Sequence, residues 1–365
     1  MKRTITELAL FDMLKLSLWN KFPVFNYCSF SDSDWKNVFN LAVKQGVRGL
    51  AFDGISRLDE SSQPSDELML MWAANVKMIE LRCERNTQTL LALKEELFAK
   101  GIRMLLIKGK ALAECYPIPS YREYGDIDVY LFDQWDKGNK FLQERGKWIK
   151  STSKHTAYRY SGIPIENHQT FIDLINENDI FCRKRKRAFQ EVEDLLHGIL
   201  SDDTVCYLHD LDIQIPSATF NFVFLLMHAG THLKGELVIR HICDWACFLV
   251  SNKGKYDEAI LEKVLCHLKF RNLCFLLTDV AINYVGMSIE YAPSFYHIAK
   301  KKNEEDILMD SLFHRFPGVA EVKRNTLWCK WLRFYEKHKR TDLFYKEYLP
   351  ESILRTMFVW CKKNL

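Results

Sequence analysis

Two aspartates stand one residue apart at the start of an apolar segment. Asp126 and Asp128 flank Ile127, and the apolar residues 129–132 follow. Residues two apart in a β-strand point to the same side, so the two carboxylates would lie close together and repel each other. A divalent cation between them would remove that repulsion. Because oxygen ligands select hard ions, the pair predicts a site for Mg²⁺ or Mn²⁺; the alternative is a strand end whose acids face solvent.

The residues before this pair could bind phosphate. The segment "LLIKGKALAEC" (105–115) predicts a strand, a turn at Gly109 and a short helix, whose first N–H groups can bind an anion. Lys108 and Lys110 flank the turn, and Arg122 follows before the aspartates. A phosphate-binding turn followed by a metal-binding pair is the arrangement that phosphoryl transfer needs, because its catalysis depends on positioning and charge neutralisation.

These motifs together resemble those of a known superfamily. "IKGKAL" (107–112) and "YREYGDIDVYL" (121–131) resemble the signature of the polymerase-beta-type nucleotidyltransferases: a glycine turn after the first strand, then D-x-D on the second. The sequence is also similar to an uncharacterised bacterial nucleotidyltransferase family within it. That similarity includes an acidic-x-His strand, here "IENH" (165–168), and the helical stretch "LMHAGTHLKGELVIRHICDWACFL" (226–249). It covers about residues 100 to 250.

The resemblance implies a transferase that moves a nucleoside monophosphate from an NTP to a hydroxyl or phosphate acceptor and releases pyrophosphate. Mg²⁺ or Mn²⁺ would be the cofactor. The acceptor stays open between a small molecule, a glycan precursor and RNA. By the same resemblance the triphosphate is held by Lys108, Gly109, Lys110 and Arg122.

The resemblance also assigns the acids. Asp126 and Asp128 become metal-binding carboxylates, and Glu166 becomes the third acid and metal ligand, which helps to activate the attacking hydroxyl. The strand period agrees, because Glu166 and His168 share one face. Asp173 is the rival third acid.

One position departs from the superfamily pattern. A serine usually follows the turn glycine and contacts a phosphate, whereas this sequence has Lys110. A lysine can contact phosphate as a point charge. The change also leaves open a catalytically inactive, nucleotide-binding regulatory or interaction protein.

Histidines gather in the following helical stretch. His228 and His232 are four residues apart, and His241 precedes Asp244 by three, so each pair shares a helix face. They could line the cleft beside the aspartates, with Arg240 as a phosphate contact partnered by Asp244. They could instead be structural, or form the metal site of a helical His/Asp phosphohydrolase.

Composition limits the alternatives. Apolar residues make up 48% of the 365 and charged residues 27%, which is typical of a globular protein. The net charge of +4 does not by itself imply nucleic-acid binding. The basic run at 183–187 favours a solvated helix start, with an RNA contact as the alternative. Eleven cysteines without a C-x-x-C pair, and no signal-peptide core or membrane-spanning run, predict a cytoplasmic protein with reduced thiols.

The hydrophobic period predicts an α+β fold in three parts. Residues 1–100 form an N-terminal helical segment that ends in a long helix stopped by Gly101, and 216–365 form a C-terminal helical domain. Between them, 101–215 form the nucleotidyltransferase core, a small mixed sheet. Its predicted strands are 103–107, 126–132 and a hairpin bent at Gly162, and 171–175 could extend it.

Overall fold

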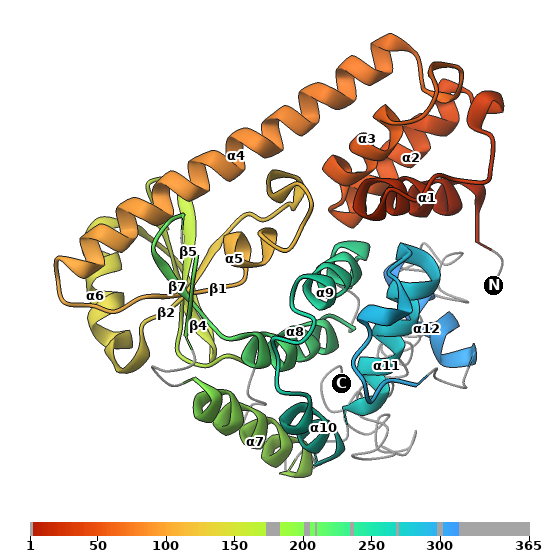
Figure 1. Cartoon of the computed structure of the whole chain (residues 1–365). Coiled ribbons are helices and arrows are strands. Elements are labelled where there is room, and N and C mark those ends of the chain that lie inside the picture. The colour runs from red at the N-terminus through yellow and green to blue at the C-terminus, as the bar shows by residue number, and fades with distance from the viewer. Residues whose placement is uncertain are drawn as a thin grey trace, which may run out of the picture.

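The computed structural model describes residues 3–172, 183–200, 205–208, 210–233, 237–267, 270–297 and 302–313. Within these ranges it combines one mixed seven-stranded sheet with helices on both of its faces, which confirms the α+β class (Figure 1). None of the helices in these ranges is long and apolar enough to span a membrane.

Three short helices and one long helix form the N-terminal part. They are α1 (Ile5–Trp19), α2 (Asp32–Gln45), α3 (Arg48–Ser56) and α4 (Asp66–Phe98). Capping boxes at Thr4 and Ser31 begin α1 and α2. Gly54 lets α3 pack directly on α1, since a Cβ there would lie 2.3 Å from the carbonyl oxygen of Met13. No proline or glycine interrupts α4, which ends just before Gly101, as predicted.

The long helix α4 joins the N-terminal helices to the sheet (Figure 1). Its first half packs on α2 and α3, while Leu90, Leu93 and Leu97 in its second half cover one face of the sheet. That face also receives helix α6 (Trp135–Arg145) through Phe141 and Leu142. The boundary predicted near residue 100 therefore falls at the end of a helix that serves both parts.

The strands run in the order β3-β4-β5-β2-β1-β7-β6. Their bounds are Leu105–Ile107 for β1, Ile127–Tyr130 for β2, Lys147–Ser151 for β3, His155–Tyr160 for β4, Ile163–His168 for β5, Cys206–Leu208 for β6 and Ile213–Ile215 for β7. Strand β2 pairs antiparallel with β1 and parallel with β5, and the β4–β5 hairpin turns at Gly162 as predicted. Strands β3, β6 and β7 were not predicted, because such short segments carry little periodicity.

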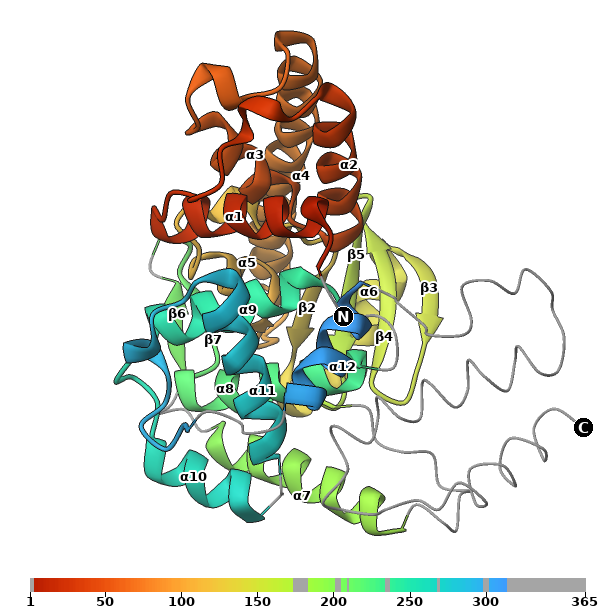
Figure 2. The same cartoon turned by 90° about the vertical axis from the view of Figure 1, so that its right-hand side faces the viewer.

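The second face of the sheet packs on the C-terminal helices (Figure 2). These are α7 (Arg183–Ile199), α8 (Ala218–His232), α9 (Ile239–Ser251), α10 (Glu258–His267), α11 (Arg271–Val280) and α12 (Lys302–Leu312). Aromatic rings connect the two layers: Tyr130 of β2 contacts Phe171, which contacts Phe220 of α8. The short helix α5 (Gly109–Ala113) follows β1. The predicted acids lie on this second face.

Candidate active site

Asp128 and Glu166 lie directly opposite each other on adjacent parallel strands. The β2–β5 register pairs Asp128 with Glu166, while Ile127 and Ile165 point to the opposite, apolar face. Asp126 lies just before β2, and its carboxylate is close enough to the other two to interact electrostatically. The sheet therefore places the three acids inferred from the sequence on one face, within electrostatic reach of one another. The rival acid Asp173 lies outside the described residues.

The turn after β1 brings a lysine to these acids. Lys108 Nζ lies 3.7 Å from Asp128 Oδ1, and the lysine side chain is largely buried. Its backbone has φ +59° and ψ −144°, a conformation that residues other than glycine rarely adopt. The next residue, Gly109, also has a positive φ, and the carbonyl oxygen of Asp126 lies 3.7 Å from where a Cβ at Gly109 would stand. A strained, closely packed turn thus positions the amine of Lys108.

The acids do not share one pKa direction. Repulsion from Asp128, together with burial, raises the pKa of Asp126 to about 6. Burial would also raise the pKa of Asp128, but Lys108 and His168 outweigh it and hold that pKa below its ordinary value. For Glu166, burial is likewise outweighed, by His155 and Lys150, so its pKa is lowered. One acid of the three therefore holds a proton more tightly than in a free peptide.

Two histidines flank the acids on β4 and β5. His168 Nε2 lies 2.8 Å from Asp128 Oδ1 and 3.9 Å from Glu166 Oε2. His155, which the β4–β5 register places opposite His168, has Nε2 3.2 Å from Glu166 Oε1. Burial lowers the pKa of His168 despite the neighbouring Asp128. The site is therefore a mixture of carboxylates and imidazoles.

Arg122 occupies a different position from the one predicted for it. Its Nε and Nη2 donate to the two carboxylate oxygens of Asp244 at 2.7 and 3.0 Å, and its Nη1 donates to the Gly109 carbonyl at 3.2 Å. Tyr116 also donates to Asp244, at 2.6 Å. Every side-chain nitrogen of Arg122 is thus used inside the protein, and its side chain is 5% exposed. The guanidinium is not placed to receive a triphosphate.

Two other predicted phosphate contacts are also engaged. Lys110 Nζ lies 2.5 Å from Glu114 Oε1, four residues further along the chain, so its amine pairs with the next turn of the helix and not with the acids. Arg240 donates to the Glu123 carbonyl at 2.6 Å. The sequence paired Arg240 with Asp244, but the carboxylate of Asp244 faces Arg122 instead. In the basic run, the first side chain described is Arg187, which is exposed and lies 3.0 Å from Glu191.

The helical histidines form a cluster of three. One ring nitrogen from each of His228, His232 and His241 lies within 4.8 Å of the others. Burial lowers the pKa of His228 and His241 well below the ordinary value, and Lys108 adds to the effect on His228. His228 therefore lies within electrostatic reach of the carboxylate site, whereas Asp244 is bound to Arg122.

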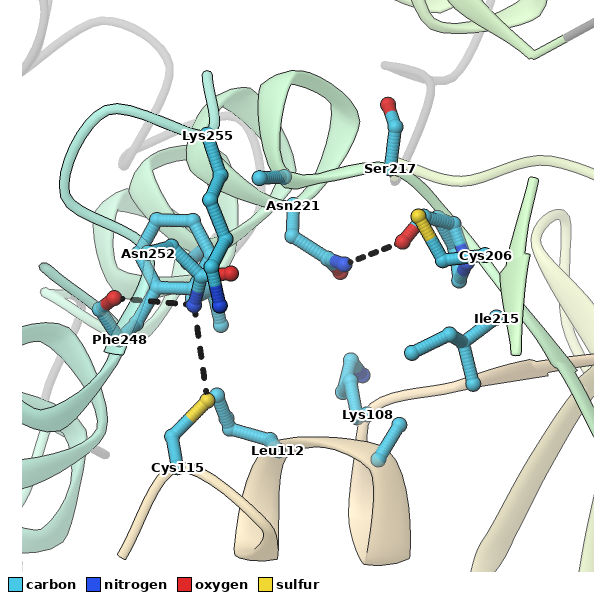
Figure 3. A pocket seen from close by; sticks show the side chains of 14 residues that line it. Lys108, Leu112, Cys115, Cys206, Ile215, Ser217, Asn221, Phe248, Asn252 and Lys255 are labelled. Atoms are coloured by element: carbon cyan, nitrogen blue, oxygen red, sulfur yellow. Dashed lines mark hydrogen bonds between the residues drawn. The ribbon is translucent and has the colours of Figure 1, made fainter. Parts of the chain in front are cut away.

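A pocket of about 280 Å³ is lined by Lys108 but by none of the three acids (Figure 3). Helix α5 forms its floor, and α8, α9 and the β7 end form its walls. Asn221, Asn252 and Lys255 extend toward its interior, and the buried Phe248 forms part of its wall (Figure 3). The amide nitrogens of the two asparagines donate to backbone carbonyls, and these hydrogen bonds do not use the side-chain oxygens of the asparagines.

Comparison with known proteins identifies the family. A family model described as an uncharacterised nucleotidyltransferase matches residues 31–286, more than half of the chain. The chain belongs to this family. The match begins in the N-terminal helices and so extends well beyond the stretch whose motifs resembled it. No curated protein and no solved structure matches the chain.

Sequence reasoning missed several residues of this nucleotidyltransferase. Lys150, Lys154 and His155 come from β3, the β3–β4 turn and β4, and all act electrostatically on the acids. His155 could have been found by counting back through the hairpin. A two-residue turn at 161–162 pairs 160 with 163, and each further step leads to the pair of His155 with His168. Nothing in the sequence placed Lys150, because β3 was not predicted.

Proposed function

We propose that this nucleotidyltransferase moves a nucleoside monophosphate from an NTP to a hydroxyl or phosphate acceptor, releases pyrophosphate and uses a divalent ion. The observation that carries the proposal is the pairing of Asp128 with Glu166 across β2 and β5, next to Asp126 and the Lys108 turn. Three carboxylates on one face are the oxygen donors that Mg²⁺ and Mn²⁺ take. The donor set therefore fits such an ion.

Each residue then has a role that its surroundings support. Bound at Asp126, Asp128 and Glu166, the ion would neutralise charge on the transferred phosphoryl group. Lys108 can turn from Asp128 to a phosphate oxygen, because 3.7 Å is too long for a strong hydrogen bond. Glu166, whose pKa is lowered, is ionised at neutral pH, which suits a ligand of the ion. We also assign it the proton of the attacking hydroxyl, the role that the superfamily resemblance implies. We assign Arg122 to holding the Gly109 turn instead of binding phosphate.

The pocket beside Lys108 suits the non-phosphate part of a substrate. Its volume of about 280 Å³ is close to the lower end of small-molecule sites. The side-chain oxygens of Asn221 and Asn252 can accept hydrogen bonds from amino or hydroxyl groups, and Leu112, Ile215 and Leu225 add an apolar lining. We propose that it receives the nucleoside, so that the phosphates extend past Lys108 to the acids.

The helical phosphohydrolase has less support. Its predicted acid, Asp244, accepts hydrogen bonds from Arg122 and Tyr116 and is not among the ligand atoms that gather at the three-histidine cluster, although it acts electrostatically on His241. The predicted histidine ligands and the predicted aspartate ligand of that metal site therefore do not form one site. Within the described residues, the acids of β2 and β5 are a stronger basis for function.

Pyrophosphate release tests the proposal. The full chain would be incubated with each NTP, Mg²⁺ or Mn²⁺, and fractionated cell extract, and both pyrophosphate and label transfer measured. One NTP should give both products, and Asp128→Asn should abolish them. Asp133→Asn is a matched control, since this exposed acid follows β2 but lies away from the site. Nucleotide binding without pyrophosphate from any extract would instead identify an inactive, nucleotide-binding relative.

A further inference from the structure

We propose that His168 is a direct ligand of the ion at this site, and that nitrogen ligation makes the site select Mn²⁺ over Mg²⁺. The inference rests on the proposed function, because it concerns the ion bound by Asp126, Asp128 and Glu166. It adds a residue to the metal site and decides between the two ions that oxygen donors alone would accept.

The imidazole of His168 lies between two hydrogen-bond acceptors. Its Nε2 is 2.8 Å from Asp128 Oδ1, and its Nδ1 is 3.3 Å from the carbonyl oxygen of Thr170. A neutral imidazole carries one proton and cannot donate to both. With the proton on Nε2, the ring donates to Asp128 and stabilises its charge in the absence of a metal ion. With the proton on Nδ1, donated to Thr170, the lone pair of Nε2 becomes available to a cation that Asp128 also binds, so the two tautomers correspond to the metal-free and metal-bound site.

This arrangement is the usual one for a metal-binding histidine. Such a residue binds the ion through one ring nitrogen, and its other ring N–H donates to a backbone carbonyl or carboxylate that fixes the ring. Thr170 supplies that carbonyl for His168, and the side chain is fully buried. The ring is therefore held in one orientation, with Nε2 directed to the acids.

His155 supplies a second nitrogen in the same place. One ligand atom from each of His155, Glu166 and His168 lies within 4.8 Å of the others. Both ring nitrogens of His155 are buried, and within the described ranges Nδ1 has no hydrogen-bond partner, while Nε2 has only its contact with Glu166. A buried imidazole in that condition gains a partner when an ion binds. The contact of its Nε2 with Glu166 Oε1, at 3.2 Å, places it beside a predicted ligand.

Nitrogen donors change the preference among metals. Mg²⁺ prefers oxygen ligands and gives up its water reluctantly. Mn²⁺ also takes oxygen ligands, but as a transition metal it accepts an imidazole nitrogen more readily than Mg²⁺ does. Two lysines compete for the same acids, since Lys108 lies 3.7 Å from Asp128 and Lys150 lies 3.3 Å from Glu166. An ion that gains one or two nitrogen ligands is better able to displace these amines than one held by carboxylates alone.

The cluster of His228, His232 and His241 offers a weaker site. His241 Nδ1 accepts a hydrogen bond from the Val238 N–H at 3.1 Å. The neutral ring then carries its proton on Nε2 and has no lone pair left for a metal. A test of His168 still has to separate this cluster from the acids, and Asp128→Asn does so because it changes only the latter.

Pulsed electron paramagnetic resonance of Mn²⁺ bound to the full chain tests the inference. A directly bound imidazole gives a nitrogen modulation, and labelling all histidines with ¹⁵N should change it from the ¹⁴N to the ¹⁵N pattern in the unaltered protein. His168→Gln should weaken or remove the modulation and lower Mn²⁺ affinity by at least about tenfold. Mg²⁺ affinity, measured by calorimetry, should change much less. His197→Gln is the matched control, a half-exposed histidine on α7 beside Tyr130.

The outcomes separate the inference from the proposed function. Tight Mn²⁺ binding that is lost in Asp128→Asn but shows no histidine modulation would overturn the role of His168 and leave the carboxylate site standing. Binding that survives Asp128→Asn would overturn both, because the ion would then lie elsewhere, for example at the helical histidines. If His168→Gln does not fold, the ¹⁵N result and the same measurement on His155→Gln decide.

Discussion

Of the three acids at the site, Asp126 is the one whose charged form the protein stabilises least. Its pKa is raised to about 6 by Asp128 and by burial, so the folded protein binds this proton more tightly than the unfolded chain does. Between about pH 4 and pH 6, the contribution of Asp126 to stability therefore falls as pH rises. Asp128 and Glu166, whose pKa values are lowered, contribute in the opposite direction and lose stability as pH falls. At neutral pH the ionised Asp126 is repelled by Asp128, and a bound cation would remove this unfavourable free energy.

Replacing Asp126 with Asn should stabilise the metal-free protein. The substitution removes a repelled charge and keeps the side-chain shape, so the free energy of unfolding at pH 7 should rise by about 1 to 2 kcal/mol. The gain should shrink toward zero near pH 4, where the wild-type acid is already protonated. Urea unfolding in EDTA at both pH values measures it, with Asp133→Asn as the control. Equal stability of Asp126→Asn and wild type at pH 7 would contradict the repulsion.

The same proton should compete with the metal. Because Asp126 must lose its proton to bind a cation, affinity for Mn²⁺ should rise about tenfold between pH 5 and pH 7. Calorimetric titration at the two pH values measures this change. In Asp126→Asn the affinity should be lower, and the part of the pH dependence that Asp126 supplies should disappear. A dependence that is unchanged in the variant would assign the titration to another group.

Glu166 separates binding from turnover. Replacing Glu166 with Gln should leave most nucleotide binding intact, because Lys108, Asp126 and Asp128 remain. It should lower turnover by roughly 10²-fold or more, the usual scale for the loss of a positioned base. Nucleotide affinity and the rate of pyrophosphate release are measured on the same preparation. A variant that turns over as fast as wild type would point to a different proton acceptor.

At the scale of elements, the turn between β1 and α5 combines strain with function. Lys108 has a positive φ and an amine beside Asp128, so its backbone favours glycine while its side chain supplies a charge. Both Lys108→Gly and Lys108→Ala lose the amine, so the difference in stability between them measures the cost of the strained backbone conformation. The glycine variant should be more stable than the alanine variant by about 1 kcal/mol or more. Thermal unfolding measures the difference, and both variants should lose most activity.

A similar comparison defines the role of Lys110. Its amine is held by Glu114 along α5, whereas that of Lys108 reaches the acids. Lys110→Ser restores the residue usual in the superfamily and should lower turnover, but by less than Lys108→Ala does. The two variants are compared by pyrophosphate release at saturating NTP. A rise from no detectable activity in Lys110→Ser would mean that the natural chain binds nucleotide without transferring it.

The elements that could be predicted have local sequence signals, whereas those that could not depend on contacts between distant parts of the chain. The apolar runs predicted as strands at 103–107 and 126–132, and the glycine turn at 162, are local signals, and strands β1 and β2 and the β4–β5 hairpin form within them. Strand β7 could not be found, because its pairing with β1 joins residues about a hundred positions apart over a three-residue segment. Likewise the choice of Asp244 as the partner of Arg122 depends on how α9 packs, which no local pattern encodes.

At the scale of the whole molecule, one buried ion pair connects the carboxylate site to the C-terminal helices. Arg122 precedes β2 and holds the Gly109 carbonyl, while Asp244 lies on α9. Both side chains are almost fully buried, at 5% and 6% exposure, and Tyr116 completes the hydrogen bonding of the carboxylate. The helical part thus supports the turn that positions Lys108, although it contributes none of the three acids.

Removing one partner of this pair should therefore affect stability and activity together. Asp244→Ala leaves the guanidinium of Arg122 buried without a counter-charge, which should cost about 3 to 5 kcal/mol of folding free energy. The double substitution Arg122→Met with Asp244→Leu removes both charges and should recover part of that stability but not the activity, because the Gly109 carbonyl still loses its donor.

Urea unfolding and pyrophosphate release are measured on all variants. Glu80→Ala is the control: its pair with Lys77 lies at the surface, with the lysine exposed and the glutamate partly exposed, so the loss should stay below about 1 kcal/mol. If Asp244→Ala unfolds no more easily than Glu80→Ala, the pair does not hold the two parts together. If the double variant keeps full activity, the turn does not depend on Arg122.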